Sequence, residues 1–167
     1  GWNFRMSEFQ AAVLLAQFER MPDLIHHKNR NAEVVAAGLA EIGGIGWPKP
    51  DERIGLQSLV YPRLRYHQEA FDGLPADAFA GALRAEGIPC GAGAGWVLYR
   101  HPLFAESRFL FPSSKGIDYT KVHCPNAENA GGRWLALPQE VMLADETAMA
   151  DLVEAVAKVK ANRAELL

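Results

Sequence analysis

The sequence predicts a small α+β domain in which helices pack on one face of a short sheet, preceded by two consecutive helices. Two observations indicate this fold class. The 167 residues are 49% hydrophobic and 22% charged, which is the composition of one ordinary globular domain. Apolar residues follow helical spacing in some segments and form short Val-, Tyr- and Leu-rich runs in others. Their order is helix, helix, strand, helix, strand, strand, helix.

The first quarter of the chain is expected to form the two consecutive helices. Ser7 precedes Gln10 by three residues and stands ahead of an apolar run, which is the capping-box pattern of a helix start. This helix should run to about Arg20, because Pro22 lacks an amide hydrogen and imposes a boundary or a kink. Helical spacing then resumes and ends before Gly43-Gly44, with apolar positions at Ile25, Ala32, Ala36, Leu39 and Ile42.

The sheet is expected after a loop over residues 46–57. Residues 59–66 are predicted as a strand, and Pro62 within it favours an edge position. Residues 75–86 have the pattern of a helix, and residues 88–90 that of a short strand.

The last third of the chain begins irregularly and ends in regular structure. Residues 91–132 are expected to form a long irregular segment, and residues 134–137 are expected to form a strand. A final helix should begin at Asp145. Its single apolar face is formed by Met149, Leu152, Val153, Val156 and Val159.

Charge and cysteine content narrow the possible partners. The net charge of −3 and pI near 6.0 offer no basic surface for a nucleic acid, so no nucleic-acid partner is expected. The longest aliphatic run is residues 11–16, far short of the about 20 residues that span a bilayer, so no membrane association is expected. Cys90 and Cys124 are expected to be reduced thiols of a cytoplasmic protein.

The residues themselves define no complete active site. His123-Cys124 has no second Cys/His pair at metal-binding spacing, so no metal site is predicted. Residues 91–95 are rich in glycine but open no helix, which favours a loop over a phosphate-binding turn. Ser114-Lys115 has no partner base and is expected in a solvated loop. His26 and His27 fall on the polar side of a helix and are expected to face solvent.

A family resemblance adds what the patterns alone do not give. The opening Gly-Trp-Asn-Phe-Arg-Met-Ser-Glu-Phe-Gln-Ala-Ala resembles a segment of the sugar aminotransferases, pyridoxal-phosphate enzymes that act on nucleotide-linked keto-sugars and keto-cyclitols and include aminohydroxybenzoate synthase. Further segments resemble the family in its order: residues 15–20, 86–89, 99–104, 124–128 and 137–138. Together they correspond to the C-terminal part of such an enzyme. Because Gly1 falls inside the motif and the first methionine is Met6, we expect a fragment.

The resemblance implies the small C-terminal domain of a fold-type-I aminotransferase. Residues 1–45 would be a helical segment that links to a large pyridoxal-phosphate domain, and residues 46–167 the small domain. The Schiff-base lysine and the aspartate beneath the pyridine nitrogen would belong to the large domain, so the isolated chain is expected to be inactive. The full protein would be a cytoplasmic homodimer that transfers an amino group from glutamate or glutamine to a keto-sugar or keto-cyclitol. The alternative is a stand-alone, non-catalytic dimerisation or interaction module derived from the family.

The same resemblance assigns candidate site residues. Asn3 would reach across the dimer to the cofactor phosphate of the neighbouring subunit, as a neutral amide donor. Arg5 would complement the same anion or a substrate diphosphate, or else act as a structural clamp. Trp96, Tyr99 and His123 would lie at the rim that faces the substrate.

Overall fold

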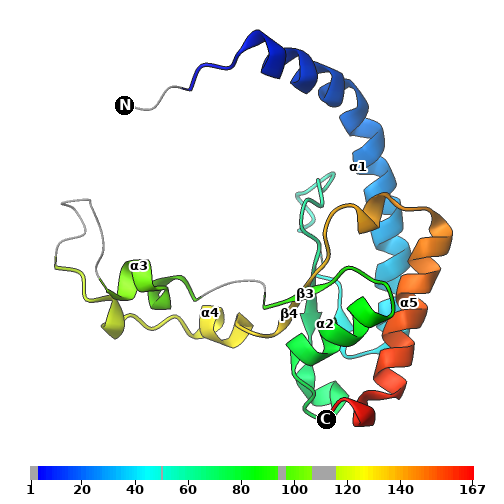
Figure 1. Ribbon diagram of the computed structural model, residues 1–167, viewed down its shortest axis with the longest axis vertical. Coiled ribbons are helices and arrows are strands. Elements are labelled where there is room, and N and C mark those ends of the chain that lie inside the picture. The colour runs from blue at the N-terminus through cyan, green and yellow to red at the C-terminus, as the bar shows by residue number, and fades with distance from the viewer. Residues whose placement is uncertain (1–3, 50, 94–96, 107–115) are drawn as a thin grey trace.

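The computed structural model describes residues 4–49, 51–93, 97–106 and 116–167. A long helix, α1 (Glu8–Ile42), runs beside the C-terminal helix α5 (Glu146–Ala161), next to a small sheet (Figure 1). An arm that carries the short helices α3 (Pro102–Ala105) and α4 (Pro125–Ala130) extends from the other side of the sheet. The N-terminal end of α1 projects away from both parts, so only its C-terminal half contributes to the core.

Helix α1 is one continuous helix of 35 residues, so the expectation of two helices separated at Pro22 is wrong. Its expected start is confirmed: the Gln10 amide donates to Ser7 Oγ, and the Ser7 amide donates to Gln10 Oε1. Pro22 removes its own amide donor from the helix. The helix curves along its length and continues (Figure 1), because strong helix formers flank the proline and α5 holds the second half.

The sheet of the described residues has the order β1-β2-β4-β3, and each neighbouring pair is antiparallel. Its strands are β1 (Ile45–Gly46), β2 (Arg63–Tyr66), β3 (Gly91–Ala92) and β4 (Trp134–Ala136). Strand β2 is therefore interior, and the edge position expected from Pro62 is wrong. Pro62 stands just before β2 and uses only its carbonyl, which accepts a hydrogen bond of 2.9 Å from the Leu137 amide.

The third strand also lies away from its expected place at residues 88–90. The Ile88 amide donates to the Leu83 carbonyl at 2.9 Å and so closes the end of α2 (Ala76–Ala85). Pairing with β4 begins only at Gly91, which faces Ala136. Strand β4 lies where the sequence analysis expected it.

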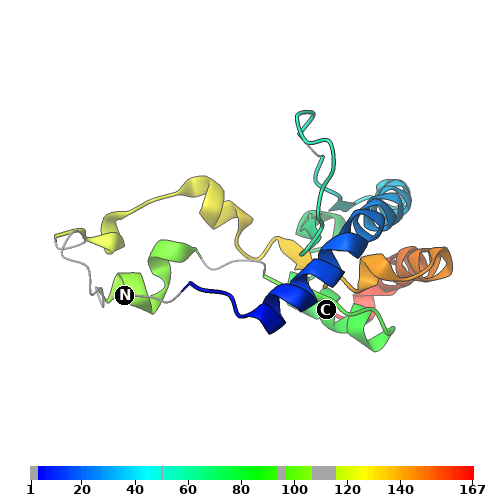
Figure 2. The ribbon, with the colours of Figure 1, turned by 90° about the horizontal axis from the view of Figure 1, so that it is seen from above.

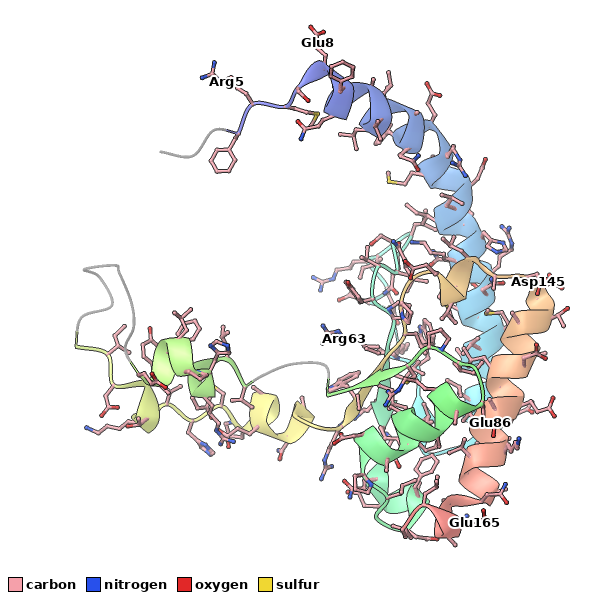
Figure 3. All side chains as sticks on the ribbon, viewed as in Figure 1. Arg5, Glu8, Arg63, Glu86, Asp145 and Glu165 are labelled. Atoms are coloured by element: carbon pink, nitrogen blue, oxygen red, sulfur yellow. The ribbon has the colours of Figure 1, made fainter. Side chains whose placement is uncertain are left out.

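The helices cover one face of the sheet, as predicted. Along β2, Leu64 and Tyr66 are buried whereas Arg63 and Arg65 are exposed. Figure 3 shows Arg63 directed away from α1 and α5. Beneath the covered face the rings of Tyr66, Phe71 and Phe79 pack with centroids 4.7–5.2 Å apart, and the Tyr66 hydroxyl donates to the Leu74 carbonyl at 2.8 Å. This aromatic cluster anchors α2 to the sheet.

Helices α1 and α5 pack closely because α1 has a glycine at their contact. A Cβ on Gly38 would lie 2.7 Å from both γ-carbons of Val153. The apolar face predicted for α5 is confirmed for Met149, Leu152, Val156 and Val159, which are buried.

Polar side chains of α1 fasten two loops to the core. Asn31, which is 2% exposed, donates to the carbonyls of Met142 and Ala144 at 3.0 and 2.8 Å. His27 Nε2 lies 2.9 Å from the Ala144 carbonyl. His27 is thus half-buried against the 141–144 turn instead of facing solvent as expected, because the turn carbonyls need donors. Lys28, 6% exposed, donates its Nζ to the Ser58 carbonyl.

The arm returns to the sheet after its two short helices, as Figure 2 shows from above. Its described part includes two 3-10 helices of one turn each, η2 (Leu98–Arg100) and η4 (Tyr119–Lys121). The Phe104 and Tyr119 rings meet edge to face, with centroids 5.5 Å apart. Along the described parts of the chain, no helix is long and apolar enough to cross a membrane.

Candidate functional site

The arm is organised around the carboxylate of Glu128, on α4. Oε1 accepts hydrogen bonds from the Tyr99 hydroxyl and from the Cys124 amide, the latter at 3.0 Å, and lies 2.7 Å from His123 Nδ1. Oε2 lies 3.0 Å from Arg100 Nη2. The Glu128 side chain is only 18% exposed although its helix is short and lies on the surface. One carboxylate therefore joins the outgoing segment, residues 97–106, to the returning segment, residues 116–131.

The electrostatics of this cluster favour an ionised Glu128. The hydrogen bond from Tyr99 holds the pKa of the Glu128 carboxyl below its usual value, with smaller contributions from the Cys124 amide, His123 and Arg100. The pKa of Tyr99 is raised, first by partial burial and then by donation to the carboxylate. Tyr99 thus stays protonated as a donor at neutral pH, and Glu128 stays charged as the acceptor.

An open groove of about 400 Å³ lies beside this cluster. Its lining includes Tyr99, Arg100, Tyr119, Lys121 and His123. Because Glu128 engages Nδ1 of His123, the other ring nitrogen, Nε2, remains for a ligand. The groove thus offers aromatic faces, two cationic side chains and an oriented imidazole to a polar, ring-shaped molecule.

The structure brings two of the predicted site residues together and separates a third. Tyr99 and His123 meet at Glu128. Arg5 is exposed on the segment that precedes α1, away from the arm (Figure 3). Asn3 and Trp96 lie outside the described residues, as do Ala94, Gly95, Ser114 and Lys115.

Glu128 is the central residue that the sequence analysis did not assign. It belongs to the 124–128 segment that carries the resemblance, four residues after Cys124. An acidic residue in the first turn of a helix that opens with proline was the available signal. That signal does not predict that Glu128 pairs with Tyr99, because Tyr99 is 29 residues away along the chain.

Among the described residues, no group of three or more His, Cys, Asp or Glu side chains is arranged to hold a metal ion. His123 is engaged by Glu128, and Cys124 is an exposed free thiol. Cys90 is also free but buried, and burial raises its pKa to about 11. The two cysteines thus differ in environment, one thiol lying in the core and the other at the surface.

The described residues do not form a pyridoxal-phosphate pocket by themselves. A lysine that binds the cofactor needs a free amine at an open cavity. Lys28 is the only buried lysine of the described residues, and its amine donates to the Ser58 carbonyl. Lys121 lines the groove beside Glu128, but its amine lies 3.1 Å from Asp118 Oδ2. No step of pyridoxal-phosphate chemistry is therefore assigned to these residues.

Comparison with solved structures identifies the fold as that of an aminotransferase part. The chain superposes on 3-amino-5-hydroxybenzoic acid synthase with a TM-score of 0.78 and 26% identity, over 97% of this chain and 41% of the synthase chain. An aminotransferase from Psychrobacter cryohalolentis, 20% identical, shares the fold with a TM-score of 0.76, over 97% of this chain and 40% of that chain.

The chain belongs to the DegT/DnrJ/EryC1/StrS aminotransferase family, whose sequence profile matches residues 1–157. It is 33% identical over 172 residues to an L-glutamine:2-deoxy-scyllo-inosose aminotransferase of Streptoalloteichus tenebrarius, covering 99% of this chain and 40% of the relative. It is 30% identical over 169 residues to a protein of Micromonospora echinospora named as an L-glutamine:3-amino-2,3-dideoxy-scyllo-inosose aminotransferase, covering 97% of this chain and 40% of the relative. The chain thus spans about two fifths of the length of these relatives, and it corresponds to their C-terminal part.

Proposed function

We propose that this chain is the C-terminal part of a pyridoxal-phosphate-dependent aminotransferase, which transfers an amino group from glutamine or glutamate to a keto-cyclitol or a nucleotide-linked keto-sugar in the cytoplasm. The observation that carries the proposal is the family match over residues 1–157. The names of the relatives favour L-glutamine as donor and a scyllo-inosose as acceptor.

In this proposal the arm supplies one wall of the substrate site. Tyr99, His123 and Trp96 would face the acceptor, and Glu128 would hold Tyr99 and His123 in place. Cyclitols and sugars present hydroxyl groups around a ring with apolar C–H faces, and aromatic and polar side chains together suit such a ring. The groove beside Glu128 has this lining, which supports the assignment.

The large pyridoxal-phosphate domain would be joined through residues 1–45, and residues 46–167 would form the small domain. The exposed apolar side chains of α1 support this division. Phe9, Val13, Leu14 and Phe18 are 88, 64, 52 and 62% exposed, and such contiguous apolar surface is unusual unless another surface covers it. In the proposal, the large domain and the second subunit of a homodimer cover this surface.

The direct test is an assay of the full-length protein with pyridoxal phosphate, L-glutamine and 2-deoxy-scyllo-inosose. Formation of the amino-cyclitol, with loss of activity when His123 is replaced by alanine, is the expected result. If product forms from a nucleotide-linked keto-sugar and not from 2-deoxy-scyllo-inosose, the acceptor is the keto-sugar, and the proposed aminotransferase activity stands. A folded full-length protein that takes up no pyridoxal phosphate and transfers no amino group would instead favour the interaction module.

Asn3 gives a second test that bears on the dimer. If Asn3 donates to the cofactor phosphate of the neighbouring subunit, Asn3→Ala should weaken cofactor affinity about ten- to a hundredfold while excess cofactor restores turnover. A mixed dimer of an Asn3→Ala chain with a partner that lacks the Schiff-base lysine but keeps Asn3 should then be active. Two folded chains that fail to complement each other would refute the contact across the interface.

A further inference from the structure

The face of the sheet that the helices leave uncovered carries a cavity to which the proposed function assigns no role. It measures about 500 Å³ and is lined by Arg65, Asn126, Asn129, Ala130, Arg133 and Trp134. It shares no lining residue with the groove beside Glu128. Asn126 and Asn129, which line this cavity, belong to the same helix as Glu128.

The backbone fixes the main side chains of this cavity. Arg65 on β2 and Trp134 on β4 are directly opposite in the antiparallel register, on the face that the helices leave open. The Arg133 carbonyl accepts a hydrogen bond of 2.8 Å from the Tyr66 amide, which extends the pairing of the two strands to Arg133. The two arginines and the indole therefore project from paired backbone, and α4 adds its two amide side chains at the border.

The cavity has an excess of positive charge. None of its lining residues is acidic. Arg133 Nη2 lies 3.4 Å from Glu69 Oε1, but the two side chains are 49 and 69% exposed, and such a surface pair is weak. Arg65 has no carboxylate within ion-pair distance among the described residues. One of the two guanidinium groups is thus fully available, and the other is held only loosely.

We propose that this cavity binds the phosphate group of a phosphorylated small molecule. Guanidinium groups form paired, charge-assisted hydrogen bonds with phosphate oxygens, and two arginines match the charge of a phosphate dianion. The volume exceeds that of a bare anion and falls in the range of small-molecule sites. Trp134 offers its face to the remainder of the molecule, and Asn126 and Asn129 offer amide groups to its hydroxyls. The inference does not depend on the proposed aminotransferase activity.

The test measures ligand binding through the fluorine NMR signal of a labelled Trp134. The full-length protein is labelled with 5-fluorotryptophan, loaded with pyridoxal phosphate and separated from unbound cofactor, because free pyridoxal phosphate is itself a phosphorylated small molecule. It is then titrated at constant ionic strength with inorganic phosphate, glucose 6-phosphate or glucose. The fluorine signal that disappears in Trp134→Phe is the reporter. We expect phosphate and glucose 6-phosphate to shift it saturably and glucose to leave it unchanged. Tighter binding of glucose 6-phosphate than of phosphate would identify a phosphorylated sugar as the source, and equal affinity would identify free phosphate.

Three variants, each of which loses one positive charge, distinguish binding in this cavity from nonspecific attraction of phosphate to a positively charged surface. Arg65→Gln and Arg133→Gln should each raise the Kd about tenfold, since each removes charge-assisted hydrogen bonds. Arg63→Gln is the matched control, because Arg63 is two residues from Arg65 on the same exposed face but does not line the cavity. Its Kd should stay unchanged. Absence of a saturable shift, or an equal loss in all three folded variants, would overturn the proposal whether or not the protein is an aminotransferase.

Discussion

His123 Nδ1 lies 2.7 Å from Glu128 Oε1, which places the imidazole within hydrogen-bond distance of the carboxylate. The same oxygen accepts the Tyr99 hydroxyl and the Cys124 amide, so a single carboxylate oxygen serves three donors from two segments of the chain. The arm contributes none of the buried apolar residues of the core within its described part. We infer that its conformation depends on this carboxylate more than on apolar packing.

Replacing Glu128 by alanine should therefore loosen the arm without unfolding the core. The Cys124 amide loses its acceptor, and we expect its hydrogen exchange to accelerate on the order of tenfold or more. Amides of α5 should keep their protection. Glu41→Ala, an exposed glutamate on α1, is the control and should change neither region. Unaltered exchange at Cys124 in Glu128→Ala would show that the arm is held by other contacts.

The same carboxylate makes the arm sensitive to acid. The pKa of Glu128 is lowered in the folded chain, first of all by the Tyr99 hydrogen bond. Its contribution is thus complete above the ordinary glutamate pKa of about 4.3 and is lost as the pH falls through the lower, folded value. Carboxyl NMR should show Glu128 titrating below the usual range of a glutamate side chain. Tyr99→Phe should move that midpoint upward, whereas Tyr61→Phe should leave it in place; an unmoved midpoint in Tyr99→Phe would contradict the assigned cause.

Local patterns in the sequence predicted those parts of the fold whose stabilising contacts are local. The Ser7–Gln10 capping box and the apolar face of α5 both rest on residues within a few positions of each other. Pro22 and Pro62 gave wrong expectations, because the missing amide of a proline does not by itself determine where a helix ends or which strand lies at an edge. Helix α1 continues past Pro22, and Pro62 stands outside the ladder of β2, so neither missing amide determines the boundary of an element.

The site was harder to predict because its contacts join distant segments. The resemblance gave Tyr99 and His123, but nothing in the sequence pattern pairs them through Glu128. The cavity at Arg65 and Trp134 was missed for the same reason, since it depends on the register of β2 against β4. Which side chains of two antiparallel strands lie opposite each other can be predicted only when the strand order and the register are known.

Two helical glycines should respond oppositely to alanine. In Gly38→Ala the new Cβ would overlap both γ-carbons of Val153, so we expect a net loss of about 1 kcal/mol despite the gain in helix propensity. Gly81 on α2 meets only the flexible end of Arg84, at 3.7 Å, so Gly81→Ala should stabilise by about 0.5–1 kcal/mol. Urea unfolding of both variants provides the measurement. A stabilised Gly38→Ala would mean that α1 and α5 separate at little cost.

Asn31 should be among the costliest polar positions on α1. Its amide group supplies donors to two turn carbonyls in a nearly inaccessible environment, so Asn31→Ala leaves both without this partner. We expect a loss of about 2 kcal/mol in unfolding free energy. Glu33→Ala, exposed on the same helix, should stay within about 0.5 kcal/mol of the parent. Equal stability of the two variants would show that water replaces the amide donors.

The two cysteines should differ sharply in reactivity. Cys90 is buried, and its pKa is raised to about 11, so at pH 8 it holds very little of the nucleophilic thiolate. Cys124 is exposed at the start of α4. Brief treatment with iodoacetamide at pH 8, followed by peptide mass spectrometry, should therefore modify Cys124 and spare Cys90. Guanidinium chloride should make the two react alike, which serves as the control. Equal modification in the native protein, or a peptide that contains both cysteines as a disulfide, would contradict the burial of Cys90 in the core.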